Sequence, residues 1–255
     1  MPEQSSPQPI VAFFDVDNTI LRGASLYHLG RGAFRAGMVT FQDVVLAAWR
    51  QAHFLRRGEN LHHLDRIRAR ALQVAAGHST RQLRELSVEI FDRDIRKRLW
   101  PETVALTREH LRNGHEVWLI TATVQEVAEV IATRLGLTGA LGTVLEEADG
   151  VFTGALRGEF LHGEGKATAA ARHAAEVGAR LEDCWAYSDS RNDIPLLELV
   201  GHPVVVNPDL ILRRHAAVRG WQVMKMKRSS IRAAQRAVRD EARAARADTK
   251  KRRVP

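Results

Sequence analysis

Residues 10–19 read Ile-Val-Ala-Phe-Phe-Asp-Val-Asp-Asn-Thr, and this stretch decides the fold class. Its five apolar residues form a run that is too short for an independent helix and that ends in a polar cluster, which is typical of a strand buried on both faces. Asp15 and Asp17 leave that strand two positions apart, so their carboxylates point to the same side. Sites in parallel α/β sheets form just beyond the carboxyl ends of the strands. The stretch therefore predicts the first strand of a parallel sheet, with two acids where a site forms.

Two carboxylates held this close repel each other unless a cation lies between them. Mg²⁺ is the natural candidate, because it prefers oxygen ligands, binds through few carboxylates and leaves room for phosphate and water. A capped turn after the strand is the alternative interpretation of residues 15–19.

A second junction between a strand and acids occurs at residues 184–193, which read Cys-Trp-Ala-Tyr-Ser-Asp-Ser-Arg-Asn-Asp. Asp189 follows the end of the apolar run, and Asp193 lies four residues further, one turn away if a helix starts here. By itself, Asp193 is equally compatible with a helix N-cap. Two such junctions on one sheet favour an acidic, metal-binding site.

Two residues suited to phosphate lie between the acidic junctions. Thr121 directly follows the predicted strand 117–120, and Lys166 stands near a predicted helix start. A hydroxyl at a strand end and a lysine at a helix start can both hold a phosphate. Single residues of these types are more often merely solvated, so it is their order relative to the acids that makes them candidates.

The rest of the chain alternates strands and helices. Strands 116–120, 183–187 and 204–206 alternate with helices 101–112, 124–135, 165–177 and 193–200. This rhythm predicts right-handed crossovers and an α/β fold with a doubly wound, Rossmann-like parallel sheet.

Asp149-Gly150 between two short apolar runs predicts a small β-hairpin flap. Helical spacing broken by glycines predicts an inserted all-helical cap. The predicted organisation is a disordered arm (1–9), an α/β core (10–22 and 101–220), a helical cap (23–100) and a basic tail (221–255).

The 255-residue chain has a net charge of +8, and this charge lies in the tail. Residues 221–255 hold twelve basic and three acidic residues, a net +9, so residues 1–220 sum to −1. Basicity therefore bears on the partners of the tail and not on those of the body. The tail arginines follow a 4-3-4-3 spacing that lines one face of a predicted helix; they stand at positions 232, 236, 239, 243 and 246.

The cellular location follows from two further features. The single cysteine, Cys184, excludes an internal disulfide and fits a reducing cytosol. No apolar run approaches the roughly 20 residues that span a bilayer. We expect a cytoplasmic protein, either free or held peripherally at a membrane by its tail.

The order Asp15-x-Asp17-x-Thr19, Thr121, Lys166, Asp189-x-x-Asn192-Asp193 resembles the four motifs of the haloacid dehalogenase (HAD) superfamily. The likeness is to subfamily IB, the phosphoserine-phosphatase-like hydrolases. It covers residues 10–215, including the flap and the cap inserted after the first motif, and leaves the tail outside. The resemblance implies a phosphatase that acts on a small organic phosphomonoester.

The resemblance also implies a role for each motif residue. Asp15 would be the nucleophile that forms an aspartyl-phosphate. Asp17 would protonate the leaving oxygen and then activate the attacking water. Phosphate-binding residues would be Thr19, Thr121, Ala122, Lys166 and Asn192. Mg²⁺ would be held by Asp15, the backbone carbonyl of Asp17 and Asp189, with Asp193 as an outer or partly direct ligand.

One departure from the family pattern concerns the substrate. Phosphoserine phosphatases carry an acidic residue shortly after the first motif, but residues 21–25 read Leu-Arg-Gly-Ala-Ser and contain no acid. This counts against phosphoserine. The substrates implied by the relatives are histidinol phosphate, phosphocholine or phosphoethanolamine, phosphoserine and a lysophospholipid. The cap is rich in basic and aromatic residues, most of which we interpret as packing or solvated positions: Tyr27, His28, Arg31, Phe34, Arg35, Trp49, His53, Phe54, His62 and His63.

Two alternative functions remain open at this point. A phosphotransferase that passes the phosphoryl group to an alcohol would use the same residues. A non-catalytic protein would bind an anionic membrane surface or nucleic acid through the basic residues between 225 and 253.

Overall fold

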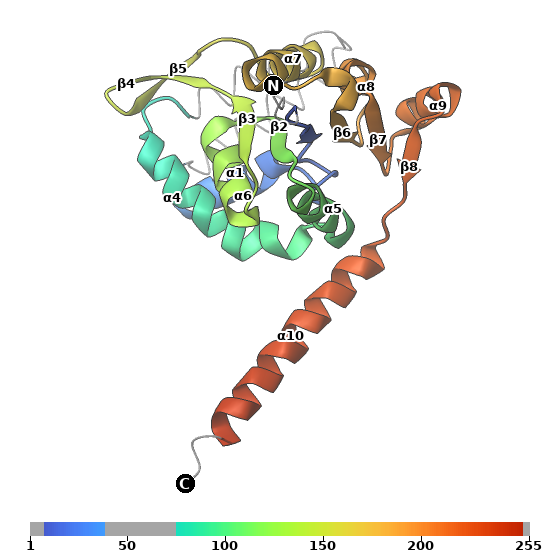
Figure 1. Ribbon diagram of the computed structural model, residues 1–255. Helices are drawn as coiled ribbons and strands as arrows, with labels where there is room; N and C mark the ends of the chain where they lie inside the picture. The colour runs from blue at the N-terminus through green and yellow to red at the C-terminus, as the bar shows by residue number, and fades with distance from the viewer. Residues whose placement is uncertain (1–7, 39–74, 252–255) are drawn as a thin grey trace, which may run out of the picture.

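In the computed structural model of the protein, residues 8–38 and 75–251 are described. They form an α/β core, cap helices beside it and a long C-terminal helix that projects away from the body (Figure 1). The predictions made for residues 1–7, 39–74 and 252–255 lie outside the described residues. They include the predictions for five cap residues, Trp49, His53, Phe54, His62 and His63.

The core is built on a six-stranded sheet in which every paired strand is parallel. Its strand order is β3-β2-β1-β6-β7-β8. The strands are β1 (Val11–Phe14), β2 (Glu116–Val124), β3 (Gly139–Thr143), β6 (Trp185–Ser188), β7 (His202–Val206) and β8 (Gln222–Met224). The order runs outward in both directions from β1, so the carboxyl ends of β1, β2 and β6 flank the topological switch point where α/β sheets bind ligands. The predicted doubly wound parallel sheet is confirmed.

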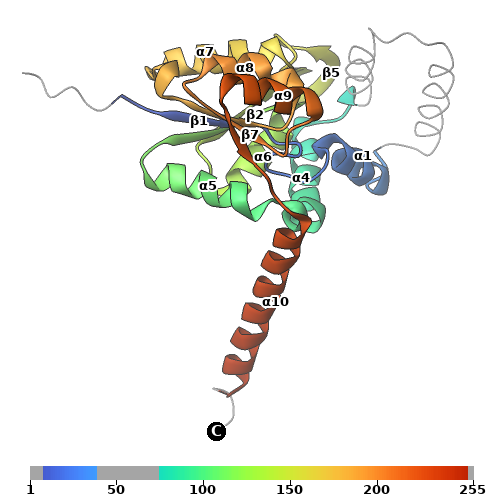
Figure 2. The same cartoon turned by 90° about the vertical axis from the view of Figure 1, so that its right-hand side faces the viewer.

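Helices cover both faces of this sheet, as Figure 2 shows. On one face lie α5 (Pro101–Arg112) and α6 (Gln125–Leu135), and on the other lie α7 (Glu164–Val177), α8 (Ile194–Leu199) and α9 (Leu210–Arg219). Two short 3-10 turns, η3 (Leu181–Asp183) and η4 (Arg191–Asp193), flank β6. Strand β1 is fully buried; Ala12 and Phe14 join one hydrophobic core and Val11 and Phe13 the other. This is why its sequence is continuously apolar.

Several elements differ from the sequence expectations. Strand β2 continues to Val124, because its end pairs with β3 after an irregularity in register. Thr121 therefore lies within a strand, not after one. Strand β3 and helix α9 were not predicted. Strand β8 lies in residues assigned to the tail, so the sheet extends past the boundary drawn at residue 220.

The predicted hairpin flap is also confirmed. Strands β4 (Leu145–Ala148) and β5 (Val151–Leu156) pair antiparallel. Between them, Asp149 and Gly150 have φ angles of 51° and 77°, the left-handed pair that a tight two-residue hairpin turn requires. The flap is tied to the entrance of the cap helix α4, since the Phe152 N–H donates to the His78 carbonyl at 3.0 Å.

The described cap residues form the helices α1 (Ser25–Arg35) and α4 (Thr80–Ile90), followed by a π-turn, η1 (Phe91–Ile95), and a 3-10 turn, η2 (Arg96–Arg98). α1 and α4 approach closely at Gly32, where a Cβ atom would lie 2.3 Å from Ile90 Cδ1.

The two connections between core and cap run side by side. Leu21 and Leu99 form a β-bridge, and the Trp100 N–H donates to the Ile20 carbonyl at 2.9 Å. Core and cap are thus linked by a paired hinge.

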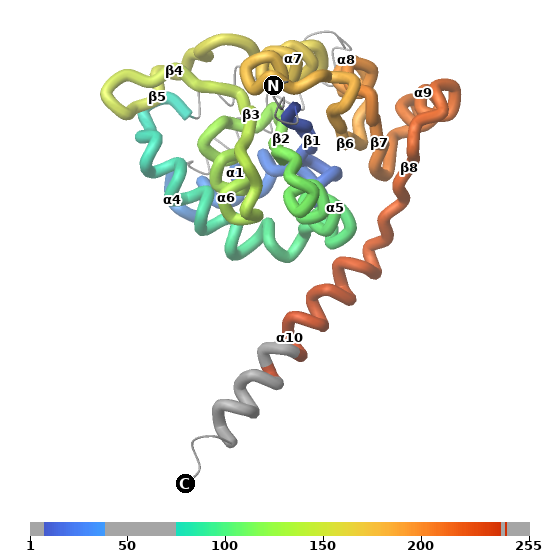
Figure 3. The backbone as a smooth tube through the Cα atoms, viewed as in Figure 1, coloured from blue at the N-terminus to red at the C-terminus, as the bar shows by residue number. Residues whose placement is uncertain are grey.

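Helix α10 (Arg228–Lys251) follows β8 after the short link 225–227 (Figure 3). Its start is anchored to the body, because Met226 and Ile231 are buried and Gln235 Nε2 donates to the Lys97 carbonyl at 2.6 Å. None of the helices in the described part of the chain has the length and apolar character that a membrane crossing requires.

A pH dependence of stability follows from His110 on α5. Its Nε2 lies 2.8 Å from the Tyr187 hydroxyl and its Nδ1 lies 2.9 Å from His115 Nδ1. Burial, together with the charge of His115, lowers the pKa of His110 to about 4. Between pH 6.5 and 4 the folded protein thus binds fewer protons here than the unfolded chain does, so the free energy of unfolding should fall as the pH drops through this window.

We expect His110→Gln to flatten that part of the pH–stability curve, as measured by urea unfolding. His215→Gln, which removes a less buried histidine, is the control. A His110→Gln curve as steep as that of the wild type would contradict the assignment.

Candidate active site

Three segments that are distant in sequence meet at the carboxyl end of the sheet. Asp15 directly follows β1, and its N–H donates to the Tyr187 carbonyl of β6 at 2.9 Å. Lys166 comes from the first turn of α7, and Asp193 closes η4 after β6. All three side chains are buried.

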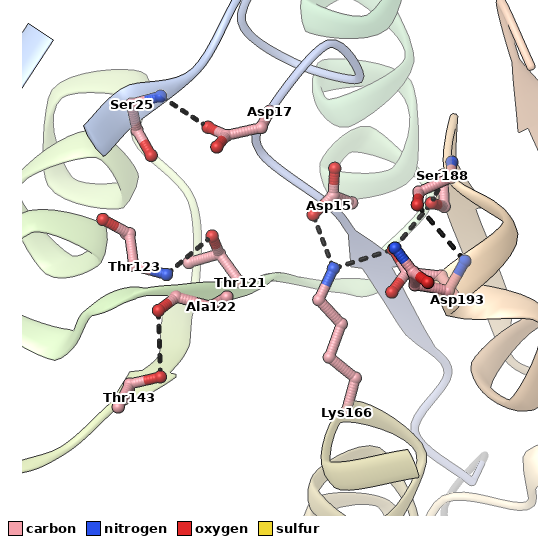
Figure 4. Close-up of polar contacts among 12 residues, drawn as sticks. Asp15, Asp17, Ser25, Thr121, Ala122, Thr123, Thr143, Lys166, Ser188 and Asp193 are labelled. Carbon is pink, nitrogen blue, oxygen red and sulfur yellow. Dashed lines mark hydrogen bonds and ion pairs between the residues drawn. The ribbon is translucent and has the colours of Figure 1, made fainter. Parts of the chain in front are cut away.

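The Lys166 ammonium bridges the two acids (Figure 4). Its Nζ lies 2.6 Å from Asp15 Oδ1 and 2.8 Å from Asp193 Oδ2. The local chain permits this approach because Gly165 packs against backbone, where a Cβ would lie 2.4 Å from the Phe160 carbonyl oxygen. The structure thus brings together three of the residues that the motifs singled out.

Ser188 is a member of the site that the sequence argument missed. Its Oγ donates to Asp193 Oδ2 at 2.7 Å, and the residue is fully buried. The signal for it was its position, because it is the first polar residue after the apolar run of β6. Asp193 Oδ2 is therefore held by Lys166 and by Ser188 together.

Asp17 lies on the loop after β1, in a different environment from Asp15. Its Oδ1 accepts the Ser25 N–H at 2.8 Å, at the start of cap helix α1 (Figure 4). Burial raises the pKa of Asp17 against the lowering effect of this hydrogen bond. A carboxyl group that keeps its proton to a higher pH is suited to act as a general acid.

Burial also governs the other acids of the site. Burial, joined by the charges of Asp193, Asp17 and Asp189, raises the pKa of Asp15 to about 8 against the lowering effect of Lys166. Burial, together with the charge of Asp193, raises the pKa of Asp189 to about 7. Both carboxylates would be ionised more readily with a further cation beside them.

These acids fit a hard divalent cation. Asp15 and Asp189 end neighbouring strands and offer carboxylate oxygens, the donors that Mg²⁺ prefers. In residues 8–38 and 75–251 no group of three or more His, Cys, Asp and Glu side chains gathers as a metal site. Mg²⁺ commonly uses only one or two carboxylates, with backbone oxygens and water as its other ligands, so Asp15, Asp189 and the Asp17 carbonyl form an adequate set.

Besides Lys166, the predicted phosphate-binding residues are two that lie in strand β2, Thr121 and Ala122, and two that lie outside it, Thr19 and Asn192. Thr121 Oγ1 accepts the Thr123 N–H at 3.2 Å, and the Ala122 carbonyl accepts the Thr143 hydroxyl at 3.0 Å (Figure 4). The Thr121 oxygen thus accepts a hydrogen bond from the backbone, while its own O–H is left to donate elsewhere. Thr19 is fully buried and Asn192 is exposed; in the described part of the chain, neither hydrogen-bonds to the Lys166 cluster.

The comparison with known families decides the identity of the fold. Residues 12–198, which include all the motif residues, match the haloacid dehalogenase-like hydrolase family. The chain belongs to this family. The resemblance drawn from the motifs is confirmed, and so is the assignment of the chain as a hydrolase.

Among the relatives of this HAD hydrolase whose names specify a substrate, two cover most of this chain. The phosphoserine phosphatase SerB1 of Mycobacterium tuberculosis is 49% identical over 213 residues, which cover 83% of this chain and 69% of the relative. A histidinol-phosphatase of Neisseria meningitidis is 32% identical over 222 residues, which cover 85% of this chain and 99% of the relative.

Solved structures support the HAD fold. A protein of unknown function from Bordetella pertussis superimposes with a TM-score of 0.74 at 32% identity and covers 85% of this chain and 98% of its own. A structure described as a phospho-aspartyl intermediate analogue of phosphoserine phosphatase has a TM-score of 0.59 at 20% identity, over 87% of this chain and 95% of its own. At that identity the second likeness bears on the fold alone.

The Lys166 bridge predicts a large stability difference between two substitutions on helix α7. Lys166→Met leaves Asp15 and Asp193 buried without their counter-charge, and we expect it to lower the free energy of unfolding by about 3 kcal/mol. Arg172→Met is the matched control, because Arg172 is exposed and its ion pair with Glu176 is 3.9 Å long; it should cost under about 1 kcal/mol. Urea unfolding in EDTA measures both, and equal losses would argue against a stabilising bridge.

Proposed function

We propose that this HAD hydrolase is a Mg²⁺-dependent phosphatase that cleaves a small organic phosphomonoester through an aspartyl-phosphate on Asp15. The observation that carries the proposal is the buried Lys166 ammonium at 2.6 Å from Asp15 Oδ1, with Asp17 two residues further along the chain. A nucleophile, an acid and a cation for the phosphoryl oxygens are the three groups that the reaction needs. The relatives named as phosphatases support the same chemistry.

In the first step an Asp15 carboxylate oxygen attacks phosphorus, and the bond from phosphorus to the ester oxygen breaks. Asp17 gives its proton to that oxygen as it leaves, so an alcohol departs and not an alkoxide. Burial raises the pKa of Asp17, so this carboxyl group keeps its proton to a higher pH than an exposed aspartate does. Its hydrogen bond from the Ser25 N–H fixes the carboxyl group on the cap side of the loop.

In the second step water attacks phosphorus and breaks the bond between phosphorus and the Asp15 oxygen. Asp17, now ionised, accepts the proton of that water and is ready for the next cycle. Inorganic phosphate and a free Asp15 carboxylate are the products. One group thus serves as the acid and then the base, which splits a difficult hydrolysis into two displacements.

Lys166 and Thr121 would hold the phosphoryl oxygens during both steps. The Lys166 ammonium offsets the negative charge on those oxygens and on Asp15 while the loose transition state forms. The Thr121 hydroxyl, which already accepts the Thr123 N–H, would donate a hydrogen bond to one of them. Bound Mg²⁺, held by Asp15, the Asp17 carbonyl and Asp189, would neutralise charge between the carboxylates and the phosphate.

The substrate class rests on the chain's own residues after the first motif. Residues 21–25, which carry no acid, disfavour a substrate that needs a carboxylate partner for its ammonium group in this place. Histidinol phosphate, phosphocholine, phosphoethanolamine and a lysophospholipid are therefore tested beside phosphoserine. An alcohol acceptor in the assay distinguishes phosphoryl transfer from hydrolysis.

The proposal predicts phosphate release that needs both Mg²⁺ and Asp15. With the panel above, wild-type release should disappear in EDTA and return with added Mg²⁺. Asp15→Asn should lower kcat by at least about 10³-fold on every substrate, because it removes the nucleophile. Activity in Asp15→Asn equal to that of the wild type would refute the covalent route, and the ranking of kcat/KM identifies the substrate class.

The role of Asp17 predicts a dependence on the leaving group. Asp17→Asn should lower kcat by about 10²- to 10⁴-fold on an alkyl phosphate, whose alkoxide needs a proton. On p-nitrophenyl phosphate, whose leaving group departs readily as an anion, the loss in the formation of the intermediate should be much smaller. Burst kinetics report that first step separately. An equal loss in the rate of intermediate formation on both substrates would show that Asp17 does not act as the general acid.

A further inference from the structure

A strongly basic pocket lies where helix α10 meets the hinge between core and cap. It has a volume of about 320 Å³. Its lining holds six basic side chains and one carboxylate, an excess of five positive charges: Arg22, Arg93, Lys97, Arg98, Arg228 and Arg232, with Asp94. We call it the hinge pocket. None of its basic residues takes part in the proposed catalytic steps.

The described part of the chain leaves most of this charge unbalanced. Asp94 is already engaged, since Arg35 Nη1 and Arg93 Nε lie 3.1 Å and 3.3 Å from its Oδ2. Within residues 8–38 and 75–251, no carboxylate forms an ion pair with the remaining arginines, Arg22, Arg98, Arg228 and Arg232. Elsewhere on the surface arginines do find partners, as in the pair of Arg84 with Glu129 at 2.7 Å.

The unpaired guanidinium groups lie close enough to affect one another. Burial lowers the pKa of Arg22, and the charges of Arg228, Arg98 and Arg232 lower it further. The amino end of α10 adds partial positive charge, and its first turn contains no acid to offset this. An anion between these groups would turn mutual repulsion into attraction.

Backbone contacts fix the walls of the hinge pocket. The Arg22 N–H donates to the Arg98 carbonyl at 2.8 Å, so both hinge segments present their arginines from paired backbone. The Gln235 side chain donates to the Lys97 carbonyl at 2.6 Å, and Ile231 is buried beside it. The first turns of α10 are therefore held against the hinge, with Arg228 and Arg232 on the pocket side.

We propose that the hinge pocket binds a ligand that carries at least two neighbouring phosphate groups. A single phosphate with two negative charges would leave most of the positive excess unbalanced. Guanidinium groups match phosphate oxygens with paired hydrogen bonds, and four arginines without ion pairs can serve more than one phosphate. Such phosphates occur on a soluble polyphosphate and on a multiply phosphorylated lipid headgroup. The proposal does not depend on the catalytic mechanism.

Calorimetric titration of the full-length protein with tripolyphosphate tests the site. The Asp15→Asn background and EDTA prevent turnover and metal-dependent binding at the active site. Arg228→Gln/Arg232→Gln should weaken binding at least about tenfold, because each arginine supplies charge-assisted hydrogen bonds. Arg236→Gln/Arg243→Gln is the matched control, since it removes the same charge from exposed positions further along α10. We expect this control to change binding less than about twofold.

A parallel arm identifies the source of the phosphates. Phosphatidylcholine vesicles that contain phosphatidylinositol bisphosphate are compared with phosphatidylserine vesicles of equal charge. Binding of tripolyphosphate that depends on Arg228 and Arg232 supports a soluble ligand, and the same dependence with the bisphosphate vesicles alone supports a lipid headgroup. Equal weakening by the two double variants, or no binding of either probe, would overturn the proposal. With the wild-type Asp15 restored, both double variants should keep the wild-type rate of phosphate release from a small monoester.

Discussion

The geometry of the candidate active site depends on keeping the Lys166 ammonium between Asp15 and Asp193 in a place that water barely reaches. Removing three charges from water is costly, and their attraction offsets this only if the geometry is held closely and the remaining oxygens are hydrogen-bonded. The hydrogen bond from Ser188 to Asp193 meets part of this requirement. The charges come from three segments far apart in sequence, so the scaffold must fix all three segments at once.

The parallel sheet provides that rigidity. Strand β1 is buried on both faces and hydrogen-bonded on both edges, to β2 and to β6. The acid that follows it therefore has little freedom to move. Across the site from β1, Gly165 in the first turn of α7 lies against the Phe160 carbonyl, where any side chain would collide. This close approach sets the start of the helix that carries Lys166.

The sequence was most informative where the structure is local. The junctions at Asp15 and Asp189 were visible because an apolar run followed by acids needs no knowledge of the partner strands. The Asp149-Gly150 turn was visible for the same reason. Strand β8 escaped because Gln222–Met224 is short and largely exposed, and only its pairing with β7 makes it a strand. Ser188 escaped because a serine after a strand is common, and only the folded chain places it against Asp193.

The charge balance of the site explains why each group in the proposed mechanism is needed. Asp15, Asp17, Asp189 and Asp193 would carry four negative charges if all were ionised, and Lys166 supplies only one positive charge. A phosphate ester would meet a net repulsion from three charges, at short range and in a region of low dielectric constant. A divalent cation removes two of them, and a proton on Asp17 removes the third. The raised pKa of Asp17, which its burial causes, and the proposed Mg²⁺ therefore answer the same electrostatic requirement. Together they let an anionic substrate approach a carboxylate nucleophile.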